Sequence, residues 1–249
     1  MMMTEPHDLT ATELLAGLPD AGEQAHRRLR DRLAAAADAA GILDVAYRTV
    51  DSPVGSLLLA ATGEGLVRVA YASEGHDAVL DRLAARVSPR VLRAPARLDA
   101  AAREIEEYFA GRRTRFDLPL DLRLCTGFRR QVISRLPGIG YGTTASYAAM
   151  AAAAGSPRAV RAAGTACATN PLPVVMPCHR VVRSDGTLGS YVGGPSVKQA
   201  LLTLEGAFPA AIPAMSHRPR HHTGDVTSTG LEPESGAGSE PGSGPGSEL

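Results

Sequence analysis

Residues 140–171 read GYGTTASYAAMAAAAGSPRAVRAAGTACATNP and decide the fold of the second half of this 249-residue chain. A first helix is predicted over residues 144–154, because Thr144 is a candidate N-cap and a glycine follows the last alanine. A second helix is predicted over residues 157–169, where Pro157 takes the first helical position and its missing N–H costs no hydrogen bond. Two helices joined by a short glycine-containing turn, with arginines near the start of the second, are typical of a helix-turn-helix, although unrelated helical hairpins share the pattern.

Around this pair the sequence predicts further short elements. Residues 127–136 have the apolar spacing of an amphipathic helix, and a last helix is predicted over residues 196–205. Between them, PLPVVMPCHRVV at residues 171–182 is an apolar, strand-like run interrupted by a polar tetrad. The second half is therefore predicted to be mainly helical, with one extended segment before the last helix.

The first half has a different pattern. Residues 44–50, 52–62 and 65–73 are short β-prone runs separated by Ser-Pro and glycine turns, which predicts an antiparallel meander. Helical spacing follows at residues 76–87 and 98–109. A sheet followed by helices predicts a small α+β domain.

These patterns divide the chain into four segments. Residues 1–42, which are polar and then rich in alanine and arginine, are predicted to form a helical extension. Residues 43–121 are predicted to be the α+β domain and residues 122–208 the helical domain. Residues 209–249 are a low-complexity run of Gly, Ser, Pro and Glu that cannot bury enough apolar surface to offset chain entropy, so we expect a disordered tail.

Charge is unevenly spread along the chain. The formal net charge is zero, but residues 122–205 hold nine basic and two acidic side chains, which gives that segment +7. Such an excess fits a phosphate-binding surface, and it also fits an ordinary solvated face. The basic side chains are Arg123, Arg129, Arg130, Arg135, Arg158, Arg161, Arg180, Arg183 and Lys198.

The three cysteines are an odd number without paired spacing, which argues against a secreted disulfide framework and against a zinc site. The first 20 residues lack the basic and apolar regions of a signal peptide, and no run approaches the about 20 apolar residues of a membrane span. The sequence thus predicts a cytoplasmic monomer that holds no cofactor or metal and does not enter a membrane.

The polar tetrad is Pro177-Cys178-His179-Arg180. A cysteine nucleophile acts as the thiolate, so it needs a base or a positive field nearby, and His179 and Arg180 are adjacent in sequence. In an extended strand, however, Cys178 and His179 would point to opposite faces. From the residues alone, Cys178 is either a nucleophile or a small buried apolar side chain.

The tetrad lies in NPLPVVMPCHRVVRSDGTLGSY at residues 170–191, which resembles the signature of the O6-alkylguanine-DNA alkyltransferases, also called methylated-DNA–protein-cysteine methyltransferases. SPVGSLLLAATGEGLVRV at residues 52–69 resembles the opening hairpin of the family's N-terminal domain, and EIEEYFAGRRTRFDL at residues 104–118 resembles its end. Residues 140–171 resemble its helix-turn-helix. The resemblance covers about residues 45–206.

This resemblance implies a small N-terminal ribonuclease H-like domain, followed by a helical, winged helix-turn-helix-like C-terminal domain that carries the active site. It implies direct reversal of DNA damage: a single-turnover methyltransferase takes the alkyl group of O6-alkylguanine, and by extension of O4-alkylthymine, from double-stranded DNA irreversibly onto Cys178. His179 would act as the base through a water, and Glu205 would orient it. Tyr147 would donate a proton to the leaving guanine. Without the resemblance, Glu205 is a helix-surface carboxylate and Tyr147 a core tyrosine.

The remaining implied residues contact DNA or the base. Arg161 would enter the duplex and fill the space of the flipped nucleotide, Asn170 would brace the turn before the active-site loop, and Arg158 would contact the DNA. The base pocket would be lined by Pro177, Val181, Tyr191, Val192 and Gly193.

Three other functions are open to a chain of this kind. A lesion-marking relative without chemistry would lack the cysteine, and a sequence-specific regulator would carry Asn, Gln or Arg along a recognition helix that is here rich in Ala and Gly. A thiol hydrolase needs an oxyanion hole, which nothing in the sequence marks. The chain departs from the family pattern at residues 126–129, 132–133 and 139–143 and at Val192, positions that affect packing and a helix entry rather than the chemistry.

Overall fold

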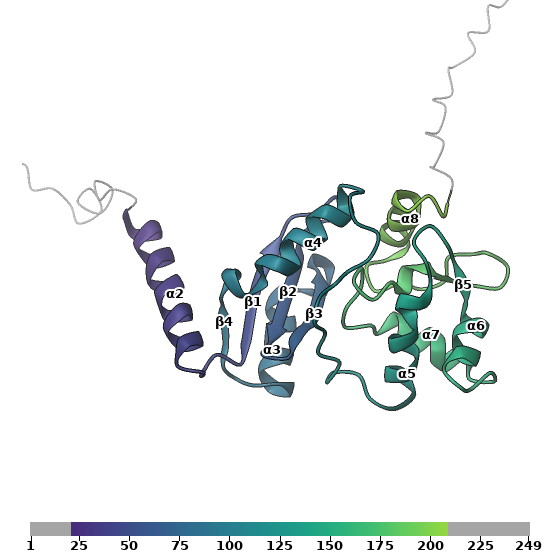
Figure 1. Cartoon of the computed structure of the whole chain (residues 1–249), viewed down its shortest axis with the longest axis horizontal. Helices are drawn as coiled ribbons and strands as arrows, with labels where there is room; N and C mark the ends of the chain where they lie inside the picture. Colours follow the sequence, from purple (N-terminus) through teal and green to yellow (C-terminus); the bar gives the residue numbers. More distant parts are fainter. Residues whose placement is uncertain (1–20, 209–249) are drawn as a thin grey trace, which may run out of the picture. The chain divides into compact units, whose positions relative to one another are not determined.

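The computed structural model describes residues 21–208, and Figure 1 shows their elements along the chain. The predicted disordered tail, residues 209–249, lies outside the described residues, as do residues 1–20. Within the described part, no helix has both the length and the apolar character needed to cross a membrane.

The first described element is helix α2 (Ala21–Ala39), in a stretch made of strong helix formers. Ala34 and Ala37 are buried against the rest of the protein, because these small side chains let the helix approach closely. Leu29 and Leu33, one turn apart, remain exposed.

Four strands form the sheet of the first half in the order β3-β2-β1-β4. β1 (Val45–Val50), β2 (Leu57–Thr62) and β3 (Gly65–Tyr71) are antiparallel neighbours, which confirms the predicted meander. β4 (Val91–Arg93) pairs in parallel with β1. The sequence does not predict β4, because three residues are too few to show a strand period.

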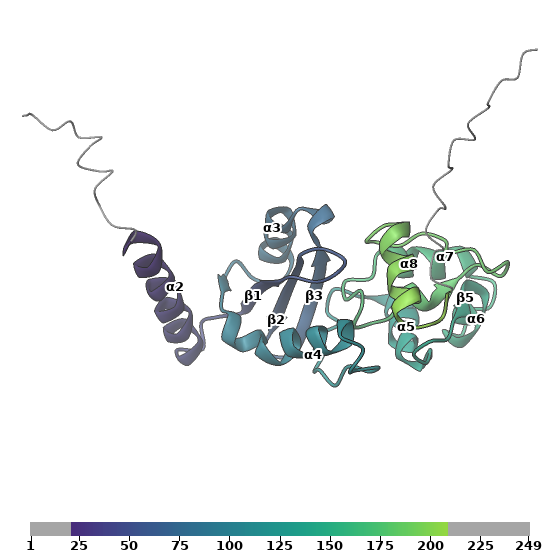
Figure 2. The ribbon, with the colours of Figure 1, turned by 90° about the horizontal axis from the view of Figure 1, so that it is seen from above.

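Helices cover both faces of this sheet, α3 (His76–Arg86) on one and α4 (Asp99–Phe109) on the other, as Figure 2 shows. Val79 and Leu83 of α3 pack against the strand residues of one face in a small apolar cluster. Ile105 of α4 packs on the opposite face, in the main cluster. Both helices lie where the apolar spacing predicts them.

The second half is mainly helical, and the predicted α+β class is confirmed. It contains two short parallel strands, which pair with each other. Its elements are α5 (Gly127–Arg135), β5 (Ala145–Ser146), α6 (Tyr147–Ala153), α7 (Val160–Ala168), β6 (Val181–Val182) and α8 (Pro195–Leu204). The 3₁₀ turns of the described residues lie in both halves. They are η1 (Ala72–Glu74) and η2 (Pro95–Leu98) in the first half, and η3 (Leu136–Gly138) and η4 (Cys178–Arg180) in the second.

The helix pair is present, but both predicted starts are wrong. The N-cap of α6 is Ser146, whose side chain accepts a hydrogen bond from the Ala149 N–H at 3.1 Å. Thr144 cannot cap this helix, because the two residues after it are extended in β5. Similarly, α7 begins at Val160, because Pro157 lies in a turn before it.

The predicted strand over residues 171–182 is also wrong in most of its length. Only β6 is extended, and the tetrad forms the 3₁₀ turn η4. Pro171, Pro173 and Pro177 lack the N–H that a strand ladder requires. Val174 has a φ of 70°, a strained conformation for a β-branched residue.

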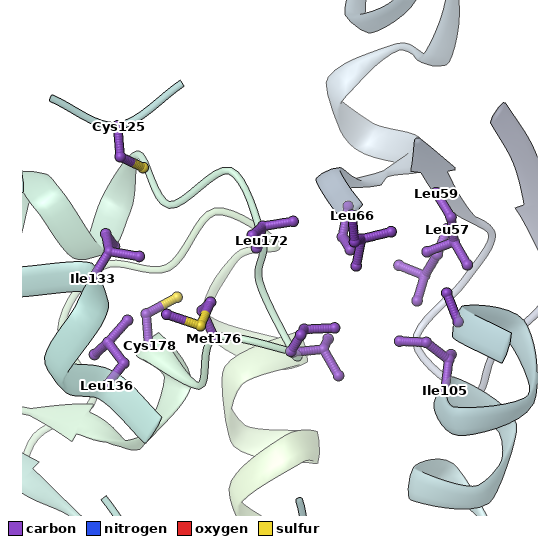
Figure 3. Close-up of a cluster of buried hydrophobic side chains, with 14 of the residues drawn as sticks. Leu57, Leu59, Leu66, Ile105, Cys125, Ile133, Leu136, Leu172, Met176 and Cys178 are labelled. Atoms are coloured by element: carbon purple, nitrogen blue, oxygen red, sulfur yellow. The ribbon is translucent and has the colours of Figure 1, made fainter. Parts of the chain in front are cut away.

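One apolar core cluster joins the two halves, and Figure 3 shows part of it. Leu57 and Leu59 of this cluster belong to β2. Leu172 and Met176 lie in the loop before η4, and Cys178 is the first residue of η4. Because all five side chains are almost fully buried, the loop that carries the cysteine is packed as firmly as the sheet.

Candidate active site

Cys178 is the first residue of η4 and is 1% exposed. Its Sγ accepts a hydrogen bond from Asn170 Nδ2 at 3.0 Å, and its backbone N–H donates to the Met176 carbonyl at 2.7 Å. Burial raises the pKa of the Cys178 thiol to about 11, although the Asn170 hydrogen bond and the charge of Lys198 act in the opposite direction. The thiol is therefore protonated at neutral pH, and a base would be needed to form the thiolate.

Asn170 organises the loop around this thiol. Its side-chain oxygen accepts from the Leu172 N–H at 3.0 Å, and its Nδ2 also donates to the Met176 carbonyl at 2.8 Å. The residue is completely buried. One amide thus clamps both ends of the loop that holds Val174 in its strained conformation, and it touches the sulfur as well.

His179 and Glu205 form a buried pair, with 2.8 Å between His179 Nε2 and Glu205 Oε1. Burial alone would raise the pKa of Glu205, but hydrogen bonds from His179, Arg180 and Tyr108 lower it to about 2. Burial lowers the pKa of His179, against the effect of Glu205. At neutral pH an ionised carboxylate therefore faces a neutral imidazole.

This ionisation state fixes the tautomer of His179. An ionised carboxylate only accepts, so Nε2 carries the proton and donates it to Glu205. Nδ1 is then the basic nitrogen, and it is buried without a hydrogen-bond partner among the described residues. Within the same part of the chain no hydrogen bond joins His179 directly to Cys178.

Two further side chains hold Glu205 in place. Arg180 donates from Nε to Oε2 at 2.8 Å and from Nη2 to Oε1 at 3.0 Å, while its Nη1 donates to the Ile139 carbonyl at 2.6 Å. Tyr108, on α4 of the first half, donates its hydroxyl to Oε1 at 2.7 Å. Glu205 is thus a fully satisfied buried carboxylate, which is the condition for it to remain charged there.

Tyr147 and Arg161 line one hollow of about 340 Å³, between α6, α7 and the loop after β6. Tyr147 donates its hydroxyl to the Ser190 carbonyl at 3.4 Å, and burial raises its pKa to about 12. Gly189 must be a glycine here, because its φ is 65° and a Cβ would lie 2.7 Å from the Tyr147 hydroxyl. The hollow is large enough for a nucleobase.

The five predicted pocket residues lie around η4 and in the loop before α8. Pro177, the first residue of the tetrad, and Val181, which follows it, are buried. Val192 is half-buried, and the Tyr191 hydroxyl lies 2.8 Å from that of Tyr71 on β3. Gly193 is also close to β3, because a Cβ there would lie 2.8 Å from the Tyr71 ring. The loop of the second half is therefore fitted against the sheet of the first.

Lys198 of α8 is completely buried and supports the same loop. Its Nζ donates to the Val181 carbonyl at 2.5 Å and to the Leu188 carbonyl, and lies 5.7 Å from the centroid of the Tyr147 ring. Burial lowers the pKa of Lys198 to about 8, against the influence of Cys178. The Lys198 ammonium thus places positive charge near the Cys178 sulfur, although the two groups form no ion pair.

Comparison with known proteins agrees with this geometry. Residues 45–122 match the family described as 6-O-methylguanine DNA methyltransferase, ribonuclease-like domain, and residues 127–207 match 6-O-methylguanine DNA methyltransferase, DNA binding domain. A methylated-DNA–protein-cysteine methyltransferase of Mycolicibacterium paratuberculosis is 40% identical over 161 residues, which cover 65% of this chain and 92% of the relative. The chain belongs to the methylated-DNA–protein-cysteine methyltransferase family.

Other members of the methyltransferase family agree. The mouse methylated-DNA–protein-cysteine methyltransferase is 37% identical over 68% of this chain and 84% of its own length. The crystal structure of Mycobacterium tuberculosis OGT in complex with DNA has a TM-score of 0.55 and 38% identity, and the match covers 64% of this chain and 92% of that one. The predicted family and the ribonuclease-like and DNA-binding architecture are therefore confirmed.

The structure groups the predicted site residues of this methyltransferase in three places. Cys178 lies with Asn170, His179 lies with Glu205, and Tyr147 lies with Arg161 in the hollow. Arg158 is exposed in the turn before α7 and does not line the hollow. Cys178 and the five predicted pocket residues do not line it either.

Three participants are not assigned by the sequence: Tyr108, the carboxylate contacts of Arg180, and Lys198. The sequence contains a pattern that could have identified Lys198 as a buried residue. It precedes Leu201, Leu202 and Glu205 by three, four and seven residues, so it lies on the same buried face of the helix. Tyr108 has no such pattern, because its contact joins positions almost 100 residues apart.

Proposed function

We propose that this chain repairs DNA by transferring the alkyl group of O6-alkylguanine to Sγ of its own Cys178, once per molecule. As a member of its family it is a DNA-repair methyltransferase that acts on a cysteine, and DNA is its partner. The observation that carries the assignment of the residues is the buried thiol of Cys178 beside the neutral imidazole of the His179–Glu205 pair.

The reaction starts with removal of the thiol proton. Since the pKa of Cys178 is raised to about 11, His179 Nδ1 takes the proton through a bridging water, and the carboxylate of Glu205 stabilises the imidazolium that forms. Sγ then attacks the alkyl carbon: a C–S bond forms, the C–O6 bond breaks, and its electron pair leaves with guanine. Tyr147 gives a proton to that anion and becomes a phenolate. The phenolate regains a proton from solvent, and His179 releases to solvent the proton that it took from the thiol.

The base must leave the stacked duplex to reach a sulfur that is 1% exposed. Extrusion costs a few kcal/mol, less for a weakened pair. Arg161, which is exposed at the start of α7, would fill the space left in the stack. Arg158 would contact phosphate, and Pro177, Val181 and residues 191–193 would enclose the base.

The product is a thioether, which water does not cleave, so the transfer uses up the protein. The same C–O bond occurs in O4-alkylthymine, and we extend the proposal to that lesion. We also propose that the chain acts as a monomer, because residues from its own two halves meet at the Glu205 carboxylate of the described site. The three cysteines are free, which supports a reducing compartment, the cytoplasm.

Intact-mass measurement after incubation with an alkylguanine-containing duplex tests the proposal. We expect one added alkyl mass, located at Cys178 by peptide mapping, and no second turnover. Cys178→Ala should abolish the gain and retain DNA binding, while Cys125→Ala, which removes another buried thiol, should leave the gain intact. Multiple turnovers, or an alkyl group on another residue, would refute the assignment.

A further inference from the structure

Four arginines surround a second hollow of about 150 Å³, which we call the arginine hollow. Arg68 comes from β3, Arg82 and Arg86 from α3, and Arg129 from α5, so both halves of the protein contribute. Its other lining residues are apolar or proline, and no Asp or Glu lines it. None of these arginines takes part in the chemistry at Cys178.

The charges of the arginine hollow are only partly balanced. Arg68 forms an ion pair with Glu74. Among the described residues, no carboxylate lies within 4.0 Å of Arg82, Arg86 or Arg129. Four arginines and one glutamate leave the hollow strongly positive. The guanidinium groups repel one another at this spacing unless an anion binds between them.

Two of the guanidinium groups are fixed by backbone carbonyls. Arg129 donates to the carbonyls of Thr169 and, at 3.3 Å, of Leu124, while Arg68 donates to the Asn170 carbonyl at 3.5 Å. These bonds orient the groups without neutralising them. Burial lowers the pKa of Arg68, and the charges of Arg82 and Arg129 act in the same direction, so these groups are near neighbours.

The carbonyl contacts of Arg68 and Arg129 also show where the arginine hollow lies relative to α7. Thr169 and Asn170 directly follow α7, the helix that carries Arg161 at its other end. A nine-residue helix is about 13 Å long, which corresponds to about four base pairs along a DNA strand. A duplex that meets Arg161 and runs along α7 would therefore bring phosphates to the hollow.

We propose that the arginine hollow binds a backbone phosphate of the substrate duplex, and so adds the sheet domain to the DNA-binding surface. The inference rests on the proposed DNA-repair function. Arginine forks match the tetrahedral oxyanion of a phosphate, and a backbone phosphate brings the negative charge that the hollow lacks. The contact is independent of base sequence, as a protein that searches for damage at any guanine requires.

The salt dependence of DNA affinity tests this inference. We would measure binding of an unmodified duplex of about 20 base pairs to the full chain at several salt concentrations, for the wild type and for R82Q/R86Q. Each lost phosphate contact makes the slope of log affinity against log salt shallower by about 0.9. We expect a change of about 1–2 and at least a tenfold loss of affinity near 0.1 M salt.

The control is R28Q/R32Q on α2, which removes two exposed arginines with the same four-residue spacing and the same change of net charge. It should leave the slope unchanged. Equal slopes for R82Q/R86Q and the wild type, or equal changes in both double variants, would overturn the inference. Thermal unfolding would check that both variants fold. Alkyl transfer from the free alkylguanine base should be unchanged in both, which separates this test from that of the reaction.

Inorganic phosphate provides a second arm. At constant ionic strength, replacing chloride by phosphate should weaken DNA binding by the wild type more than by R82Q/R86Q, because the ion competes for the hollow. If phosphate weakens DNA binding by neither protein, the inference fails. It also fails if phosphate binds the hollow while the DNA salt slope of R82Q/R86Q stays at the wild-type value, because the hollow then does not hold the duplex.

Discussion

The two halves of this protein keep their shape by different means. In the sheet half, residues 45–109, β2 is buried along its whole length, its alternate side chains enter apolar clusters on opposite faces of the sheet, and one side of each covering helix is buried. In residues 170–194 of the other half, regular structure is short, and Asn170, Arg180 and Lys198 fix the loops by hydrogen bonds to backbone carbonyls. Apolar periodicity builds the scaffold, and buried polar side chains build the reactive site on it.

This contrast means that similar substitutions should have different effects in the two halves. Each half holds a buried glutamate: Glu104 on α4, 3.2 Å from Arg113, and Glu205 in the site, 2.8 Å from Arg180. Glu104 accepts from the Asp117 N–H at 2.9 Å and so supports only the chain fold. The pair offers a matched test of scaffold against site.

Glu205→Gln is expected to have the largest effect. The amide leaves the buried Arg180 charge unpaired, which costs about 3–5 kcal/mol, and no longer fixes the tautomer of His179. We expect the alkyl-transfer rate per folded molecule to fall at least a hundredfold, measured by single-turnover kinetics. Glu104→Gln should lower the free energy of unfolding but leave that rate within about twofold. Equal rate losses in both variants would remove the distinction between the halves.

The stability of the protein at acid pH should also depend on the Glu205 carboxylate. The pKa of Glu205 is lowered to about 2 in the folded protein, so its stabilisation is present above the unfolded pKa and disappears as pH falls from about 4.5 to 2. A shift of this size corresponds to about 3 kcal/mol. Urea unfolding of the wild type should lose stability over this window, and Glu205→Gln should lose correspondingly less.

Tyr108→Phe tests the contact at which the two halves meet. The change removes one donor to Glu205 Oε1 and leaves the ring packing in place. Such outer partners of a reactive group are worth about tenfold, so we expect a loss of that order in alkyl-transfer rate and about 1–2 kcal/mol in stability. Because the carboxylate becomes more basic, the pKa of His179 should rise, and the acid limb of the rate profile should move to higher pH.

A purely structural role for Tyr108 would predict a different result. The stability would fall, but the pH profile of the folded protein would not move. Tyr47→Phe on β1, a half-buried tyrosine of the same sheet half, serves as the comparison and should change neither the rate nor the profile. An unshifted profile in Tyr108→Phe would show that Arg180 alone maintains the carboxylate.

Ser146→Ala has the smallest expected effect and tests the scaffold of the helix pair. Removal of the cap at the start of α6 should cost about 1 kcal/mol in the free energy of unfolding. Thr144→Ala, at the position that the sequence favours for the cap, should cost less than about 0.5 kcal/mol, since Thr144 is exposed and precedes β5. Neither should alter transfer from the free base. A larger loss at Thr144 would contradict the cap seen in the structure.

The same contrast explains what can be predicted from the sequence. The strands β1 to β3 follow from β-prone runs separated by turn residues, and the helices α3 and α4 follow from apolar spacing. The family follows from the tetrad and its surroundings. The short strand β4 and the start of α7 do not, because strand pairing over three residues and a turn containing Pro157 depend on tertiary contacts.

Within the site, the limit is distance along the chain. The sequence places Cys178 beside His179 but predicts a strand, whereas three prolines and the Asn170 clamp produce a 3₁₀ turn. The resemblance supplies Glu205 but not the Tyr108 hydroxyl that shares its oxygen. Local pattern nominates the candidate reacting groups, and only the fold shows which distant side chains hold them in place.

The position of Glu205 after the last described helix also has a consequence for timing. His179 has no fixed tautomer until Glu205 has been made, and at about 5–20 residues per second the 27 positions from Cys178 to Glu205 take about 1–5 seconds to synthesise. The sheet domain, with Tyr108, is complete well before that. On the proposed assignment, the protein therefore passes during its own synthesis through a stage in which Cys178 is present but the carboxylate that would fix its base is not.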